Sequence, residues 1–389
     1  MRRILIIAST GLNKNSPSSA RISHYVNNLK SKYIINYYNF EDKSPYWLKT
    51  PFKYITQIIP INWIIVFYSI LDLILNYKIS QYDLIITSIP KNEGLIIGSF
   101  LSYLYETKFI VDMRDELLYQ QKLIMIRNKF SESIFLRFIL LGWKYLYLIL
   151  VEQPYHLCIK KSNEIVVVTN IMSNNLLSKY RLKNISIIPN GIDPEVLYGY
   201  KEDEKVEPDT DFIFIGNLNN SYYNLDKLIL NLNDLNDINV KIKIIGQCNQ
   251  SYLAKLDHMA AKHIEINYIS TIPQNQIPHY LKRSKIGIIS YPDHSDWKSA
   301  IGAKFYEYAA YGLYIIASGP TESELERICE IDSYWVFVSR SNNYKNKLEY
   351  LLYSKLLTSE KIKRSQHYSN KFSRDSLIPK WINLIEALF

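Results

Sequence analysis

Lys304 and Glu307 carry the two side chains in this sequence that are best suited to hold a nucleotide. They lie three positions apart, so a helix would place both on one face. An ammonium group binds phosphate, and a carboxylate accepts hydrogen bonds from ribose hydroxyls. The pair therefore predicts a nucleotide site, with the phosphates near Lys304 and the ribose near Glu307. The competing interpretation is a buried helix whose lysine and glutamate are solvated or paired with each other.

The segment that must position this pair, residues 285–318, has the pattern of a strand, a polar loop, a helix and a second strand. Its first strand, 286–290, is a short apolar run of the kind found in buried parallel sheets. We expect the helix to begin near Ser299 and to end at Gly312, since glycine is a common helix stop. Because ligands of open α/β sheets bind outside the carboxyl ends of the strands, the loop and the start of the helix would face a cleft.

The start of this helix is a second reason to expect an anion there. The backbone N–H groups of residues 300–303, which include those of Ala300 and Gly302, would have no partner within the helix. Together with the helix dipole they would form an anion site beside Lys304.

Arg114 and Asp115 are the second candidate pair. They directly follow the expected strand 109–113, so they also lie at a carboxyl end, where catalytic groups gather in α/β sheets. The competing interpretation is an ion pair within a loop.

Alternating strands and helices occur in two series of similar size, which predicts two doubly wound, Rossmann-like α/β domains. We place the first domain at residues 1–195 and the second at 196–370, with a terminal helix at 371–389 that could cross back to the first domain. The expected strands are 4–8, 33–40, 83–88, 109–113, 164–169, 186–189, 211–215, 239–245, 264–268, 286–290, 314–317 and 335–338.

Composition narrows the class of partner and site. The net charge of +9 favours anionic partners such as phosphorylated substrates or acidic membrane. The positive charge is spread along the chain without a nucleic-acid-binding motif, so we do not expect nucleic acid to bind. The three cysteines are isolated and the seven histidines form no ligand cluster, which predicts a cytoplasmic protein without a metal site. The pattern Asp209-Thr210-Asp211 resembles a metal-binding Asp-x-Asp motif but precedes its strand, so we interpret it as solvated.

Two segments raise the question of a membrane. Residues 122–152 are basic and apolar, and residues 54–71 form an uncharged run. Both belong to the first domain. We expect either burial against the sheet or peripheral binding to anionic lipid, with no spanning helix.

The order and spacing of several motifs resemble those of glycosyltransferases of the GT-B fold and family 4 type, particularly the bacterial enzymes that build surface polysaccharides such as O-antigen and capsule. The anchors are Thr87-Ser88-Ile89-Pro90, Val111 to Asp115, Glu152 before the strand that ends at Thr169, Ile188 to Asp193, Phe214 to Leu218, Ile244-Ile245-Gly246, and Lys304 to Ser318. The resemblance implies two Rossmann-like domains that face each other across a cleft. It also implies a UDP- or GDP-linked sugar donor in the second domain, a lipid-linked or polysaccharide acceptor at the first, retention of anomeric configuration, and no metal or other cofactor.

The resemblance assigns roles to individual residues. Glu307 matches the second glutamate of the family's donor motif, and Arg114 with Asp115 matches an active-site element. The turn at Gly216 and Asn217 corresponds to the family's diphosphate loop.

Several positions depart from the family pattern. Ser299 stands where the first glutamate of the donor motif is expected, and we expect Asp293 or Asp296 to take over its contact with the sugar. The resemblance places the first loop on the acceptor side, with Gly11, Ser18 and Ser19 as its candidate residues; Ser18 and Ser19 stand near the place of the family's glycine pair.

Two other functions remain open on the sequence alone. A nucleotide-sugar 2-epimerase has the same fold but needs carboxylates and histidines that exchange a proton, and no such cluster stands out. A non-catalytic partner subunit would explain both Ser299 and the absence of an arginine and a lysine after Gly216.

Overall fold

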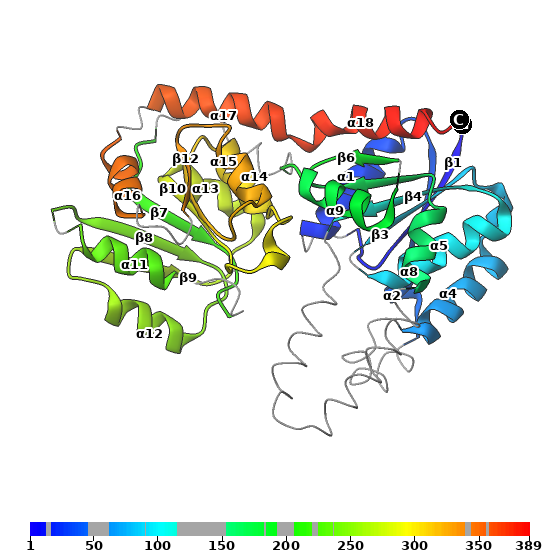
Figure 1. Cartoon of the computed structure of the whole chain (residues 1–389), viewed down its shortest axis with the longest axis horizontal. Helices are drawn as coiled ribbons and strands as arrows, with labels where there is room; N and C mark the ends of the chain where they lie inside the picture. Colours follow the sequence, from blue (N-terminus) through cyan, green and yellow to red (C-terminus); the bar gives the residue numbers. More distant parts are fainter. Residues whose placement is uncertain are drawn as a thin grey trace, which may run out of the picture. The chain divides into compact units, whose positions relative to one another are not determined.

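The structure is a computed structural model in which the chain forms two compact units (Figure 1). Unit 1 comprises Met1–Pro189 and Ile378–Phe389, and unit 2 comprises Asn190–Leu377. The residues that the structure describes are 1–12, 17–45, 62–89, 91–114, 153–182, 184–192, 206–219, 225–235, 237–338, 344–354 and 358–389.

Unit 1 is built on a six-stranded parallel sheet in the order β2-β1-β3-β4-β5-β6. All six residues of the central strand β3 are buried, as expected for a parallel strand covered on both faces. The strands are β1 Arg3–Ala8, β2 Ile34–Asn39, β3 Leu84–Ile89, β4 Lys108–Met113, β5 Glu164–Val167 and β6 Ile185–Ile187.

The helices of unit 1 connect these strands. They are α1 Pro17–Leu29, α2 Phe40–Lys43, α4 Trp63–Asn76, the 3-10 turn η1 Ile79–Gln81, α5 Asn92–Tyr105, α8 Gln153–Lys161 and α9 Asn170–Tyr180. The end of α18, Arg374–Glu386, also belongs to this unit. Trp381 packs against Tyr25 with ring centroids 5.0 Å apart, and the Tyr33 hydroxyl donates to the Glu386 carboxylate over 2.6 Å.

Unit 2 has a second six-stranded parallel sheet, in the order β12-β11-β10-β7-β8-β9. Its strands are β7 Thr210–Ile215, β8 Val240–Ile245, β9 Ile264–Ile269, β10 Ser284–Ser290, β11 Tyr314–Ser318 and β12 Trp335–Val338. Its helices are α11 Asp226–Asn233, α12 Gln250–Met259, α13 Ile277–Lys282, α14 Ala303–Ala310, α15 Glu324–Cys329, α16 Tyr344–Tyr353 and α17 Thr358–Phe372, with 3-10 turns η3 Gln274–Gln276 and η4 Ser295–Trp297.

The core of unit 2 lies on both faces of its sheet. Along β7, Ile213 and Ile215 belong to one hydrophobic cluster, whereas Phe212 and Phe214 belong to another. Successive side chains of a strand point to opposite faces, so helices cover both sides of this sheet. The predicted α/β class with two doubly wound halves is confirmed. Each expected strand begins and ends within two residues of the observed one.

Two element predictions need correction. The helix expected from Ser299 begins at Ala303. The terminal helix expected at 371–389 is present as α18, but the long helix α17 that precedes it was not expected; the two helices are separated by Ser373. Gly312, with φ of +68°, follows the end of α14 as expected of a helix-stopping glycine.

Candidate functional site

The strand order of unit 2 contains a topological switch point between β7 and β10. The chain leaves β7 toward β8 and β9, then returns to the other side of β7 and continues through β10, β11 and β12. Ligands of doubly wound sheets bind outside the carboxyl ends of the strands at such a point. The predicted donor residues Gly216 and Asn217 follow β7, and Lys304 and Glu307 follow β10, so the topology brings both groups to this crevice.

The start of α14 differs from the prediction. Gly302 is the N-cap of the helix, and its N–H donates to the Tyr291 hydroxyl over 2.6 Å. The Ala300 N–H donates to the Trp297 carbonyl over 3.2 Å. Two of the N–H groups expected to be available for an anion are therefore used within the protein, and the positive end of the helix dipole lies at Ala303 instead. The cause is the aromatic pair Tyr291 and Trp297, whose ring centroids are 4.9 Å apart and which brace the preceding loop.

Lys304 and Glu307 lie on the same face of α14, as the spacing predicted. The ammonium of Lys304 is 2.7 Å from Oε2 of Glu307, whose side chain is only 8% exposed. A buried carboxylate is costly to desolvate, and this lysine offsets that cost. The ammonium has three N–H donors and 28% of the Lys304 side chain is exposed. This geometry fits the internal pair of the competing interpretation, and it also leaves donors of Lys304 for a phosphate.

The end of β7 is closely packed against the end of β8. Gly246 has φ of +134°, and a Cβ atom there would lie 1.9 Å from the Gly216 carbonyl oxygen. Only glycine allows this approach. The Asn217 side chain donates to Gln247 over 2.9 Å and accepts from the Asn219 N–H over 2.9 Å. The Gly216 turn is thus braced by Gly246, a role that no local sequence signal revealed.

Tyr308 ties α14 to β7. Its fully buried hydroxyl accepts a hydrogen bond from the Ile215 N–H over 3.0 Å, just beyond the last residues of β7 that pair with β10. Gly287 makes room for the ring, because a Cβ atom there would lie 2.3 Å from it. Sequence reasoning missed this link, since its partners lie 93 positions apart.

The other predicted donor residues, Ser299, Ala300 and Asp296, differ in how far they are buried and in whether the structure describes their side chains. Ser299 is buried, and Ala300 is half-buried beside it. Asp296 belongs to the 3-10 turn η4, but its side chain lies outside the described residues.

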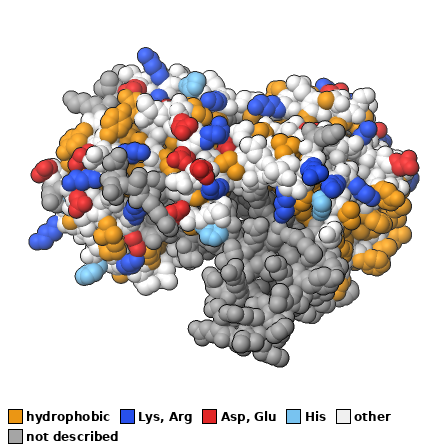
Figure 2. Space-filling view, in the orientation of Figure 1, with side chains coloured by type: hydrophobic (Ala, Val, Ile, Leu, Met, Phe, Trp, Pro, Cys, Tyr) orange, Lys and Arg blue, Asp and Glu red, His pale blue; other side chains and the backbone are white. Residues whose placement is uncertain are grey.

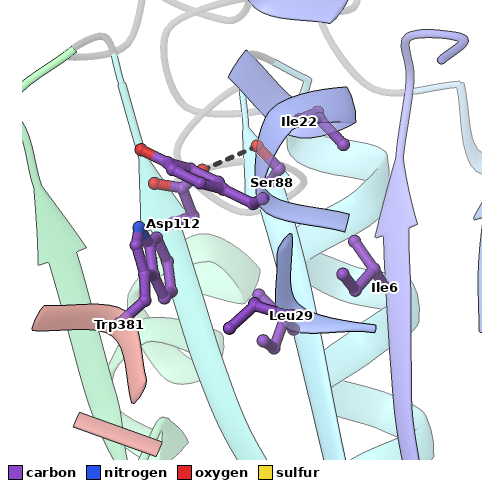
Figure 3. A pocket seen from close by; sticks show the side chains of 8 residues that line it. Ile6, Ile22, Leu29, Ser88, Asp112 and Trp381 are labelled. Carbon is purple, nitrogen blue, oxygen red and sulfur yellow. Dashed lines mark hydrogen bonds between the residues drawn. The ribbon is translucent and has the colours of Figure 1, made fainter. Parts of the chain in front are cut away.

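In unit 1, Arg114 is the first residue after β4, and its guanidinium donates to the Ser88 hydroxyl over 2.8 Å. Its predicted partner Asp115 lies outside the described residues. Asp112, two residues earlier, accepts a hydrogen bond from Ser88 over 2.9 Å (Figure 3). It also pairs with Arg21 of α1 over 3.1 Å. Arg21 and Asp112 are both almost fully buried. No role was predicted from the sequence for Arg21 or Asp112. An aspartate inside an apolar strand was the one local sign that Asp112 has a buried partner.

A small cavity lies beside this network. Ser88, Asp112 and Trp381 line it together with apolar side chains, and Figure 3 shows the Trp381 indole beside the Asp112 carboxylate. Its volume of about 20 Å³ admits about one water molecule, so it is too small for a sugar.

The predicted acceptor-side residues lie near the end of β1. Gly11 is half-buried in the loop that follows this strand, and Ser19 is buried in the first turn of α1. The side chain of Ser18 lies outside the described residues.

The Asp-x-Asp pattern at 209–211 lies at the amino end of β7, whereas the candidate donor site lies at the carboxyl ends of the strands. Asp209 pairs with Arg283 over 3.4 Å, and Asp211 accepts from the Lys241 N–H over 2.9 Å. In the part of the chain that the structure describes, no cluster of three or more His, Cys, Asp or Glu residues could hold a metal ion.

One known protein family matches the part of the sequence that forms unit 2. Residues 200–371, which lie within unit 2, match the model of the family described as Glycosyl transferases group 1. No curated protein matches the chain by sequence.

Solved structures resemble the whole chain. Sucrose-phosphate synthase from Thermosynechococcus elongatus has a TM-score of 0.62 at 11% identity, covering 100% of this chain and 99% of that one. Anabaena HepE in complex with UDP has a TM-score of 0.60 at 11% identity, with 100% of both chains covered. A putative UDP-N-acetylglucosamine 2-epimerase from Listeria monocytogenes has a TM-score of 0.55 at 11% identity, covering 100% and 96%. The chain therefore has the GT-B fold of two Rossmann-like domains, a fold that these neighbours share.

Proposed function

We propose that this protein is a glycosyltransferase that moves a sugar from a UDP- or GDP-linked donor to a lipid-linked or polysaccharide acceptor. The observation that carries the proposal is the switch point of unit 2, where the Gly216 turn and the Lys304–Glu307 pair of α14 follow the neighbouring strands β7 and β10, within a region that matches the glycosyl transferases group 1 family. UDP is the first nucleotide to test, since HepE is a structural neighbour solved with UDP.

In this proposal the residues of unit 2 bind and orient the donor. Lys304, the positive end of α14 and the Gly216 turn stabilise the negative charge that develops on the leaving diphosphate. Glu307 accepts from the ribose hydroxyls. Glycosyl transfer passes through positive charge on the sugar, so the protein contributes mainly by holding the reactants in line.

Unit 1 would supply the acceptor side. Arg114 is buried and donates to Ser88, and we propose Asp115, the next residue in the sequence, as the residue nearest the reacting hydroxyl. We propose a retaining reaction that needs no metal or other cofactor. Gly11, Ser18 and Ser19 would line the acceptor side, with surface-polysaccharide synthesis at the inner face of the cell membrane as the setting.

A panel assay tests this function directly. The purified chain is incubated with UDP- and GDP-linked sugars and lipid-linked acceptors, and both transfer and donor epimerisation are measured. Transfer supports the proposal. Epimerisation without transfer would assign the chain to the 2-epimerases, and nucleotide binding without either reaction would favour a partner subunit.

A further inference from the structure

Unit 1 exposes large apolar side chains on one group of helices. Phe67, Leu75 and Tyr103 are 66%, 77% and 70% exposed. We call the following set the apolar face: Trp63, Ile64, Phe67, Leu71 and Leu75 of α4, Phe100, Tyr103 and Leu104 of α5, and Leu157 of α8. Figure 2 shows a broad hydrophobic patch on this part of unit 1.

The outward side of α4 makes this face unusual. Ile65, Val66 and Leu73 bury the inner side of the helix in the core. Trp63, Phe67, Leu71 and Leu75 recur every four residues, which places them on one outward face, where a surface helix normally carries polar residues. Large exposed apolar patches mark contact surfaces, so α4 has the composition of a helix with two apolar partners, one of which is the core.

The three helices form one continuous surface, because α5 packs against both α4 and α8. The apolar side chains of α5 therefore extend the stripe of α4 toward α8. None of the described helices is long and apolar enough to span a membrane. A helix with an apolar outward face, such as α4, can instead lie flat on an apolar surface, with its axis parallel to that surface.

Two lysines lie beside the apolar face at the end of α8. Lys160 and Lys161 end α8, and the Lys161 ammonium lies 3.9 Å from the centre of the Tyr103 ring. Burial lowers the pKa of His156, and the positive charges of Lys160 and Lys179 lower it further. The acidic residues of α4 and α5 are Asp72, which accepts from Asn76, and the buried Glu93, with Glu106 at the C-cap of α5. Figure 2 shows lysine and arginine side chains next to the hydrophobic patch.

We propose that the apolar face binds the surface of a membrane that contains anionic lipid. The side chains of α4 and α5 would enter the boundary between headgroups and acyl chains, and the lysines of α8 would contact lipid phosphates. A second copy of the chain is the less fitting occupant, because a two-fold interface would place the same lysine clusters close to each other. The inference rests on the proposed function in one respect, namely that a membrane face would bring the enzyme to a lipid-linked acceptor.

Vesicle sedimentation with the full chain tests the proposal. The probes are phosphatidylcholine vesicles and the same vesicles with phosphatidylglycerol added. We expect binding to the anionic vesicles that weakens at high salt. The variant Phe67→Ser/Leu75→Ser should bind at least about tenfold more weakly, since interfacial binding scales with buried apolar area. Lys160→Glu/Lys161→Glu should lose most of the preference for anionic lipid.

Leu230→Ser on α11 of unit 2 is the matched control, because Leu230 is 53% exposed and lies outside the apolar face. Tyr103→Ser/Leu104→Ser repeats the test on α5, in case the α4 variant does not fold. Equal recovery in the supernatant with both kinds of vesicle at low salt overturns the proposal. So does unchanged vesicle binding in both apolar-face variants.

Light scattering of the same proteins identifies the rival occupant. A dimer that dissociates when Phe67 and Leu75 are replaced would assign the face to a second copy and overturn the membrane proposal. UDP titration separates this inference from the proposed function. Vesicle binding without UDP binding would refute the donor site alone, and UDP binding without vesicle binding would refute the membrane face alone.

Discussion

Replacing Lys304 with methionine tests the donor site most directly. Methionine keeps an apolar stem but removes the ammonium that lies 2.7 Å from Glu307. If the diphosphate binds at this place, the variant loses one charge-assisted hydrogen bond, worth about 1.5–3 kcal/mol. We expect the Kd for UDP to rise about tenfold to 150-fold.

The variant also leaves the Glu307 carboxylate without its nearest cation. Breaking a fully buried pair costs about 3–5 kcal/mol, but Lys304 is 28% exposed, so we expect a loss of about 1–3 kcal/mol in the free energy of unfolding. Adding Glu307→Gln to Lys304→Met removes the unpaired charge. The double variant should therefore recover stability while its affinity for UDP stays low.

Calorimetric titration with UDP and GDP measures the affinities, and urea unfolding measures the stabilities. Lys255→Met is the matched control, because Lys255 pairs with Asp226 on the exposed surface of the same unit. Its affinity should stay unchanged. The reasoning is refuted if folded Lys304→Met binds both nucleotides within about twofold of the original chain, since the ion pair would then serve only to neutralise a buried carboxylate.

Three further changes have expected outcomes. Gly246→Ala should lower the free energy of unfolding by about 3 kcal/mol or more, because φ is +134° and the new Cβ would meet the Gly216 carbonyl; urea unfolding would show a smaller loss if the turn can shift. Burial lowers the pKa of Lys361 from 10.5 to about 7, although three backbone carbonyls accept from its side-chain nitrogen in the ammonium form. The unfolded chain then binds more protons than the folded one between pH 7 and 10, so stability should rise with pH across this window, and Lys361→Met should flatten the slope; a flat profile in the original chain would contradict this. Asp115→Asn should spare UDP binding but reduce turnover, and EDTA should leave transfer intact; full turnover in the variant would mean that Asp115 is remote from the reaction.

Local sequence patterns determined the elements of both sheets. Runs such as 286–290 are apolar throughout, as strands buried on both faces must be, so their positions could be predicted without knowledge of their neighbours. Gly312 ended its helix at the predicted place because a residue in the left-handed region follows many helix ends and glycine adopts that conformation without strain. The helical spacing of Lys304 and Glu307 likewise sufficed to predict that they share one face.

The tertiary structure alone decided which strands are neighbours and how the site is braced. No residue in β7 records that β10 lies beside it, because strand order depends on long-range packing. The same holds for Tyr308 with Ile215 and for Arg21 with Asp112, which are 93 and 91 positions apart. The start of α14 moved from Ser299 to Ala303 because the hydroxyl of Tyr291, a residue of the preceding loop, takes the Gly302 N–H. Helix propensity is a local quantity, and a hydrogen bond made across a loop overrides it.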